Sequence, residues 1–138
     1  MDLEAYRVPD AVRSGVSLSL PGTDAVFHVK LPSVHNRAFG RAIQTAMFSD
    51  AKVMPDGKIE VGTIDVAALR DQRVEAFIAH CLLFPLPGGM TVETLRDEYY
   101  PALDWLFTEA ERLAADLDKE GEAAKKKSRN SSHGKSDG

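Results

Sequence analysis

The strongest constraint on the fold is an apolar stripe on one predicted helix near the end of the chain. Its residues recur every three or four positions, which places them on one narrow face of an α-helix that turns toward a core. They are Leu103, Leu106, Phe107, Ala110, Leu113, Ala114 and Leu117. Pro101 suits the first turn of this helix, and the pattern ends at 118–121.

Two β-hairpins are predicted upstream of this helix. Residues 16–20 and 25–31 alternate apolar and polar side chains, which is the period of a half-buried strand, and the turn residues 21–24 separate them. A shorter alternation over residues 52–61, interrupted by Pro55-Asp56-Gly57, predicts a second hairpin.

Helices are predicted between and after the hairpins. Ser33 is a plausible N-cap for a helix that ends near residues 48–50. Asp65 can cap a second helix, whose broad apolar face is formed by Val66, Leu69, Val74, Phe77, Ile78, Cys81 and Leu82. Residues 85–89 break the chain with two prolines and two glycines, and Thr91 can then cap a short helix.

This order of elements predicts an α+β fold, with N-terminal β-hairpins packed against a mainly helical C-terminal half. The length of 138 residues suits one domain. We expect a lead-in segment at 1–15, a single α+β domain at 16–120, and a basic, Ser-rich tail at 121–138. The tail has no large apolar residue, so we expect it to be disordered.

Charge is distributed unevenly along the chain. The net charge is −4, but residues 125–138 carry five basic residues and one acidic residue, a net +4, which leaves −8 for residues 1–124. An acidic body suits a protein partner of basic or mixed charge and disfavours nucleic acid and membranes. With one cysteine and no apolar stretch at the N-terminus typical of a signal peptide, a cytoplasmic protein is expected.

No motif assigns a catalytic activity to the chain, so we expect no enzyme and no cofactor. His80 and Cys81 are neighbours on a predicted helix, where side chains point about 100° apart and cannot act as base and nucleophile. Cys81 lies on the broad apolar face of its predicted helix and is expected in the core. The four histidines, His28, His35, His80 and His133, lack metal-ligand spacing, although a zinc site assembled from distant residues stays open.

Candidate partner-binding residues lie in the last two helices. Acidic residues crowd there and form either a solvated face or a docking surface: Glu93, Asp97, Glu98, Asp104, Glu109, Glu111, Asp116 and Asp118. Trp105 falls off the apolar stripe, on the side of Glu109 and Arg112, and either packs within its own domain or anchors a partner. Tyr99 and Tyr100 are amphipathic in the same way. The predicted partner-binding set consists of Tyr99, Tyr100, Trp105, Glu109 and Arg112.

Three stretches of the chain carry a family resemblance. They are VFHVKLPSVHNRAFGRAIQ, FIAHCLLFPLPGGMTVETLRDEYYPALDWLFTEAERLAADL and the KKKS of the tail. With the small acidic α+β body, they make the chain resemble a tail assembly chaperone of long-tailed bacteriophages or of phage-derived tail-like elements, over most of residues 16–128.

This resemblance implies a non-enzymatic function in the host cell cytoplasm. Proteins of this family bind the long, largely helical tape-measure protein and keep its apolar surface from aggregating. They are often made in two forms, and the frameshift that yields the longer form commonly falls near the end of the short one, where Lys125, Lys126 and Lys127 stand here.

Two alternatives to this function stay open. One is a structural virion component, a tail or connector subunit that assembles through exposed hairpin edges. The other is a nucleic-acid-associated protein that contacts phosphates through its basic tail. Self-association is compatible with every one of these functions.

Overall fold

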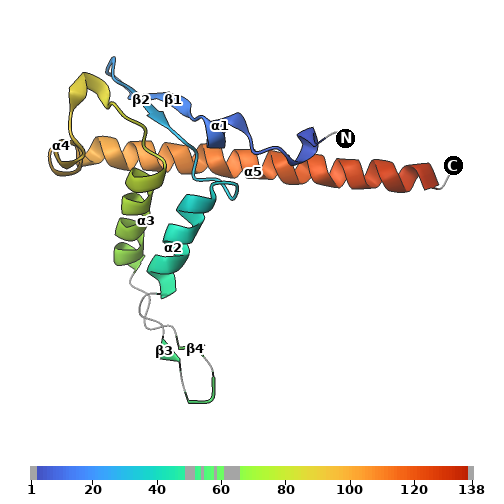
Figure 1. Ribbon diagram of the computed structural model, residues 1–138. Helices are drawn as coiled ribbons and strands as arrows, with labels where there is room; N and C mark the ends of the chain where they lie inside the picture. The colour runs from blue at the N-terminus through green and yellow to red at the C-terminus, as the bar shows by residue number, and fades with distance from the viewer. Residues whose placement is uncertain (1–2, 49–51, 54, 58, 61–65, 137–138) are drawn as a thin grey trace.

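The chain folds as an N-terminal β-hairpin with a mostly helical remainder (Figure 1), and this confirms the α+β class. The computed structural model describes residues 3–48, 52–53, 55–57, 59–60 and 66–136. Its elements are η1 (Glu4–Tyr6), α1 (Asp10–Arg13), β1 (Val16–Ser19), β2 (Val26–Val29), α2 (Arg37–Phe48), β3 (Lys52–Val53), β4 (Ile59–Glu60), α3 (Val66–His80), η2 (Pro87–Gly89), α4 (Val92–Asp97) and α5 (Tyr100–Ser136).

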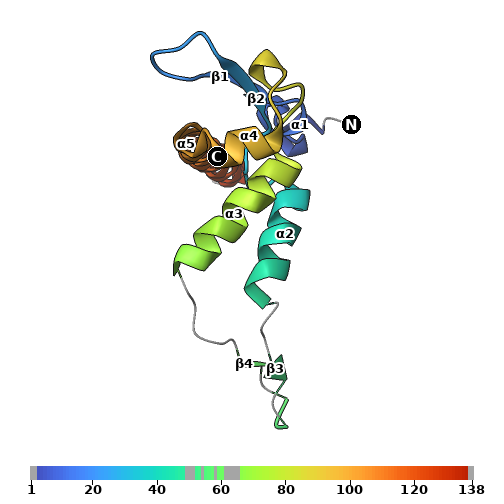
Figure 2. The same ribbon diagram turned by 90° about the vertical axis from the view of Figure 1, so that its left-hand side faces the viewer.

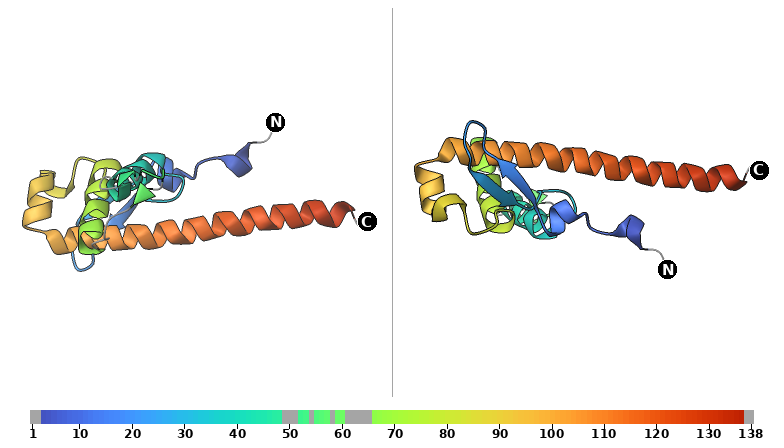
Figure 3. Two further views of the ribbon diagram at one scale, coloured as in Figure 1. Left: turned by 90° about the horizontal axis from the view of Figure 1, so that it is seen from below. Right: turned by 90° about the horizontal axis from the view of Figure 1, so that it is seen from above.

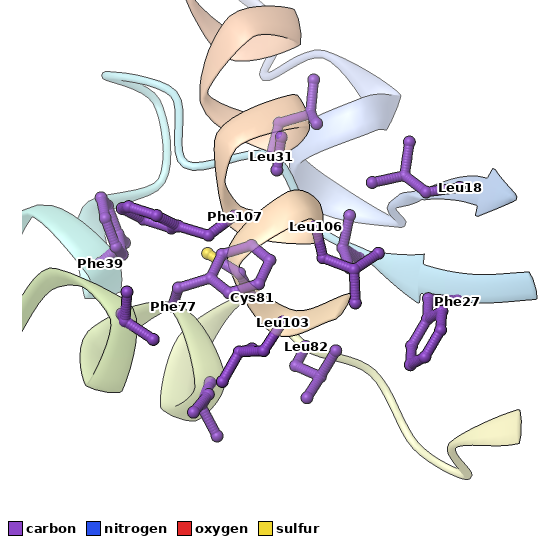
Figure 4. Packing of buried hydrophobic residues seen from close by; sticks show 14 of the residues in the cluster. Leu18, Phe27, Leu31, Phe39, Phe77, Cys81, Leu82, Leu103, Leu106 and Phe107 are labelled. Atoms are coloured by element: carbon purple, nitrogen blue, oxygen red, sulfur yellow. The ribbon is translucent and has the colours of Figure 1, made fainter. Parts of the chain in front are cut away.

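Helix α5 is the central element of the fold. The β1–β2 hairpin lies on one side of it, and the α2–α3 helix pair lies on the other side (Figures 1 and 2). The predicted stripe faces the core as expected, because Leu103, Leu106, Phe107 and Ala110 have no exposed surface. The ring of Phe107 packs edge-on against Phe77 of α3, with 5.5 Å between ring centroids (Figure 4).

The first predicted hairpin is confirmed. Strands β1 and β2 pair antiparallel with Leu18 opposite Phe27, and both of these side chains are buried while His28 faces outward. The outer edge of β2 bonds to a segment that the sequence did not assign to the sheet: the N–H of Lys30 donates to the carbonyl of Cys81 (2.7 Å) and that of Leu83 to the carbonyl of His28 (2.9 Å).

Helices α2 and α3 lie side by side, and the β3–β4 hairpin lies at the end of this pair that is farther from α5 (Figures 1 and 2). The second predicted hairpin is confirmed in part, because strands of two residues each pair antiparallel. The predicted cap Asp65 lies outside the described residues. The predicted cap Thr91 is confirmed, since its Oγ1 accepts a hydrogen bond from the N–H of Thr94 (3.2 Å).

The N-cap of α2 differs from the sequence-based prediction. Asn36, not Ser33, caps this helix: its Oδ1 accepts from the N–H of Phe39 (3.2 Å), and its Nδ2 donates to the carbonyl of Leu31 (3.3 Å). The hydroxyl of Ser33 donates to Asp118 of α5, and its oxygen accepts from the N–H of His35 (3.1 Å). Because α2 begins at Arg37, the N-cap position falls on Asn36 and not on Ser33.

Part of the predicted lead-in segment belongs to the core, although the sequence places the start of the domain at residue 16. Helix α1 buries Val12 in the core, and the carbonyl of Ala11 accepts a hydrogen bond from the N–H of Leu31 (3.1 Å). Gly15 then passes so close to β2 that a Cβ there would lie 2.8 Å from the carbonyl oxygen of Val29. The core therefore begins before residue 16.

The last helix is longer than predicted. The backbone of α5 stays helical through Ser136, and residues 121–136 therefore differ from the disorder that the sequence predicts there; the helix continues past the body of the molecule (Figure 3). Two local properties favour this outcome. Glu, Ala and Lys, which fill residues 122–127, are strong helix formers, and basic residues are favourable in the C-terminal part of a helix because of its dipole.

Candidate partner-binding site

Tyr99 and Tyr100 lie where α4 meets α5. Their exposed fractions are 51% and 42%, whereas Leu95 before them and Leu103 after them are fully buried. Two large amphipathic side chains are therefore held at the surface by elements that are anchored on both sides. Exposed tyrosines on a fixed backbone are well suited to contact a protein partner.

Three acidic residues precede the tyrosine pair, two in α4 and one at its C-cap. Glu93, Asp97 and Glu98 are exposed, and within the described part of the chain their carboxylates take part in no ion pair or hydrogen bond. We call these three residues with Tyr99 and Tyr100 the α4–α5 corner. It combines apolar area with negative charge that no residue of the described chain neutralises.

Helix α4, which carries part of this corner, is tied to α3 by a two-pronged ion pair. Arg96 donates from Nε and Nη2 to the two carboxylate oxygens of Glu75, at 2.9 and 2.8 Å. Bidentate pairs of this kind fix geometry as well as charge. Because the guanidinium of Arg96 is used here, it does not neutralise the acids of the corner.

Other acidic residues of α5 are paired within the chain, so neither of the two predicted alternatives, a solvated face or a docking surface, describes them fully. Asp104 accepts a hydrogen bond from Arg70 of α3 (2.5 Å), and Glu111 pairs with Arg73 of the same helix. The Asp104 hydrogen bond raises the pKa of Arg70. Both guanidinium groups also lie over the ring of Phe107, at 5.3 and 5.7 Å from its centroid. These acids join α3 to α5.

Trp105, one of the predicted partner contacts, is half-buried and packs against the core cluster. Of the two interpretations left open by the sequence, packing within its own domain therefore describes much of this side chain. Only the uncovered part of the indole is available to another molecule.

Glu109 and Arg112 pair with each other on the surface of α5. Arg112 donates from Nε to Glu109 (3.2 Å) and from Nη1 to Asp116 (3.4 Å). The hydrogen bond between them lowers the pKa of Glu109 and raises that of Arg112. An exposed network of this kind contributes little to stability, so both side chains can be rearranged at small cost.

The structure makes Cys81 a poor nucleophile. The residue is fully buried, and desolvation raises the pKa of its thiol to about 12, so the reactive thiolate is scarce near neutral pH. His80 is exposed at the end of α3. The neighbours in sequence are thus separated into a core position and a surface position, as expected.

A serine–histidine contact that the sequence analysis did not identify lies on the outer face of the hairpin. Ser17 Oγ is 3.0 Å from His28 Nδ1, and both residues are exposed. The register that sets Ser17 opposite His28 could have revealed the pair. Within the described chain no carboxylate contacts this histidine, so the pair lacks the third group that orients the base in a catalytic triad.

Within the described residues, no group of three His, Cys, Asp or Glu side chains could hold a metal ion. In the same part of the chain, no helix is long and apolar enough to cross a membrane. Comparisons of the chain with protein-family models, with curated proteins and with solved structures found no match. The α4–α5 corner must accordingly be interpreted from its own geometry.

Proposed function

We propose that this chain is a non-enzymatic phage tail assembly chaperone that binds a tape-measure protein during tail assembly. The observation that carries the proposal is the α4–α5 corner, where the exposed Tyr99 and Tyr100 directly follow unpaired acidic side chains. The resemblance of residues 16–128 to this family supplies the identity of the partner.

The chemistry of the corner fits a long helical partner with apolar stretches and mixed charge. Tyrosine covers apolar surface with few rotatable bonds and still offers a hydroxyl to polar groups. Glu93, Asp97 and Glu98 complement basic side chains on a partner and disfavour acidic ones. A chaperone must release its client, and contacts made by exposed side chains at the surface suit reversible binding.

Trp105, Glu109 and Arg112 belong to the proposed surface as its extension along α5. Trp105 contributes the uncovered part of its indole, and the Glu109–Arg112 pair can exchange partners because it is exposed. We expect the tyrosines to contribute more binding energy than these three residues, because both are exposed whereas Trp105 packs against the core and Glu109 and Arg112 pair with each other.

Co-expression with the tape-measure protein from the same genome tests the proposal. The double variant Tyr99→Ala/Tyr100→Ala should lose the ability to keep the tape-measure protein soluble, while its own circular dichroism spectrum stays unchanged. Tyr6→Ala is the matched control, since Tyr6 is an exposed tyrosine (80%) in η1 outside the corner. If the double variant and the control solubilise the client equally, the corner is not the binding site.

The gene offers a second test that is independent of the corner. The codons for residues 124–128 should form an adenine-rich slippery run, followed by a second open reading frame that overlaps the tail. Scattered AAG codons without such a frame would remove the two-form expectation and weaken the assignment to this family.

One observation favours a second candidate function, a structural tail or connector subunit. Strand β1 has a backbone edge without a partner in the described chain, and such edges join subunits. The two functions differ in where the protein is found. A structural subunit remains in purified particles, whereas an assembly chaperone departs before maturation.

A further inference from the structure

The β-hairpin ends in an open edge at β1. Both edges of β2 are occupied, one by β1 and the other by the backbone around Leu82, which forms an isolated bridge with Val29. Strand β1 is paired on one edge alone within the described residues, so it is the terminal strand of this small sheet.

The register identifies the backbone groups that face outward. Val16 and Leu18 are opposite Val29 and Phe27, and the N–H of Leu20 donates to the carbonyl of Ala25 (3.0 Å). These residues of β1 direct their backbone groups toward β2. Because backbone groups alternate sides along a strand, those of Ser17 and Ser19 point away from β2.

Ser17 and Ser19 are both exposed, and within the described chain their outward N–H and C=O groups accept and donate no hydrogen bond. Natural edge strands are usually protected by a lysine, a proline or a bulge. Residues 15–20 read GVSLSL and contain no charge and no proline. This edge is therefore open to pairing with a further strand.

We propose that β1 pairs antiparallel with β1 of a second copy of this chain, about a two-fold axis at Leu18. In this register Ser17 of one copy lies opposite Ser19 of the other, and each such pair exchanges two backbone hydrogen bonds. The two Leu18 residues lie opposite each other at the two-fold axis. The interaction is separate from the α4–α5 corner and goes beyond the proposed client binding.

The edge itself favours a second copy over an unrelated strand. The two residues whose backbone groups point away from β2 are both serine. A two-fold rotation at Leu18 therefore places serine opposite serine. The hydroxyl of Ser17 already contacts Nδ1 of His28 (3.0 Å), whereas that of Ser19 makes no hydrogen bond in the described chain and can donate to the Ser17 oxygen of a second copy. The edge also carries no charge that would select a differently charged partner. Leu18 is already buried, so little apolar area is added and the dimer should dissociate at low concentration.

A charge pattern at positions 17 and 19 tests this register. Ser17→Lys/Ser19→Lys sets lysine opposite lysine across the two-fold axis, whereas Ser17→Lys/Ser19→Glu sets lysine opposite glutamate. The two variants change the same two exposed side chains. We expect the natural sequence to form a dimer. The lysine pair should weaken the dimer, raising its dissociation constant by about tenfold or more, and the mixed pair should retain it.

Sedimentation equilibrium over a wide concentration series measures the effect, and circular dichroism verifies that each variant is folded. Ser17→Pro is an independent variant, because it removes an outward N–H that no residue of the described chain uses, and it should give a monomer. A natural protein that stays monomeric throughout overturns the proposal. So does equal dimerisation of the lysine-pair and mixed-pair variants. Tyr99→Ala/Tyr100→Ala should leave the dimer intact, which separates this proposal from the proposed function.

Discussion

Ser33 and Asp118 are hydrogen-bonded across 85 positions of sequence: the hydroxyl of Ser33 donates to Oδ1 of Asp118 at 2.7 Å. The second carboxylate oxygen accepts from the backbone N–H of Val34 at 3.2 Å. Through these two bonds, the loop before α2 is fastened to α5 near the point where the apolar stripe ends. A single carboxylate thus fixes the position of two elements that are distant in the sequence.

Asp118→Ala should lower the free energy of unfolding by about 1–3 kcal/mol, because the hydroxyl of Ser33 is 3% exposed and would lose its acceptor. Urea denaturation measures the change. Glu120→Ala, an exposed acidic residue on the same helix, is the control and should change stability by much less. Equal effects of the two variants would show that the hydrogen bonds of Asp118 do not stabilise the fold.

Asn36→Ala should destabilise the protein by about 1–2 kcal/mol and expose the amide of Phe39 to hydrogen exchange, because the cap of α2 is lost. Ser33→Ala provides the contrast. It breaks the bond to Asp118 but leaves the cap, so the amide of Phe39 should keep its protection. Faster exchange at Phe39 in the Ser33 variant would restore Ser33 as the cap that the sequence predicted.

Gly15→Ala should be more destabilising than Gly22→Ala, although both glycines have positive φ angles, +101° and +77°. Gly22→Ala meets no atom within 4 Å, so its cost is the backbone strain alone, about 1 kcal/mol. Gly15→Ala adds a contact of 2.8 Å with the carbonyl oxygen of Val29, which a backbone atom cannot relieve without shifting β2. The free energies of unfolding of the two variants, measured in denaturant, should differ by more than about 1 kcal/mol.

The thiol of Cys81 should be unreactive toward iodoacetamide in the folded protein at pH 8 and reactive in urea. Burial raises its pKa from an ordinary 9.0 to about 12. Below pH 9 the thiol is neutral in both states and contributes no pH dependence. Between pH 9 and 12 the thiol ionises in the unfolded chain but stays neutral in the folded protein. The free energy of unfolding therefore declines, by up to about 1.4 kcal/mol per pH unit.

Cys81→Ala separates this effect from the titration of other groups. The variant should be less stable at neutral pH, because it leaves a small cavity, and it should lose less stability between pH 9 and 12. If the free energy of unfolding of both proteins declines equally between pH 9 and 12, the effect does not come from Cys81.

The elements that the sequence predicted correctly are those with local patterns. Alternation revealed both hairpins, and the spacing of Leu103 to Ala114 revealed the buried face of α5. The misassigned features depend on distant residues. Ser33 donates its hydroxyl to the distant Asp118 while the helix begins three residues later than its capping would require, and α1 gave no sign in sequence that Val12 would enter the core.

The candidate site shows the same division. The exposure of Tyr99 and Tyr100 agrees with their amphipathic character, but the acidic residues could not be sorted from sequence. Asp104 and Glu111 find arginines on α3, 34 and 38 positions away, whereas Asp97 and Glu98 find no such partner in the described chain. Which acids stay unpaired depends on how α3 crosses α5.

The length of α5 has a consequence for how the molecule moves. At a rise of about 1.5 Å per residue, its 37 residues extend for about 55 Å, while a compact domain of this chain length has a radius of gyration of about 14 Å. Such a particle tumbles anisotropically and has a larger Stokes radius than a sphere of its mass. A monomer would thus leave a calibrated gel-filtration column early, in the position of a globular dimer.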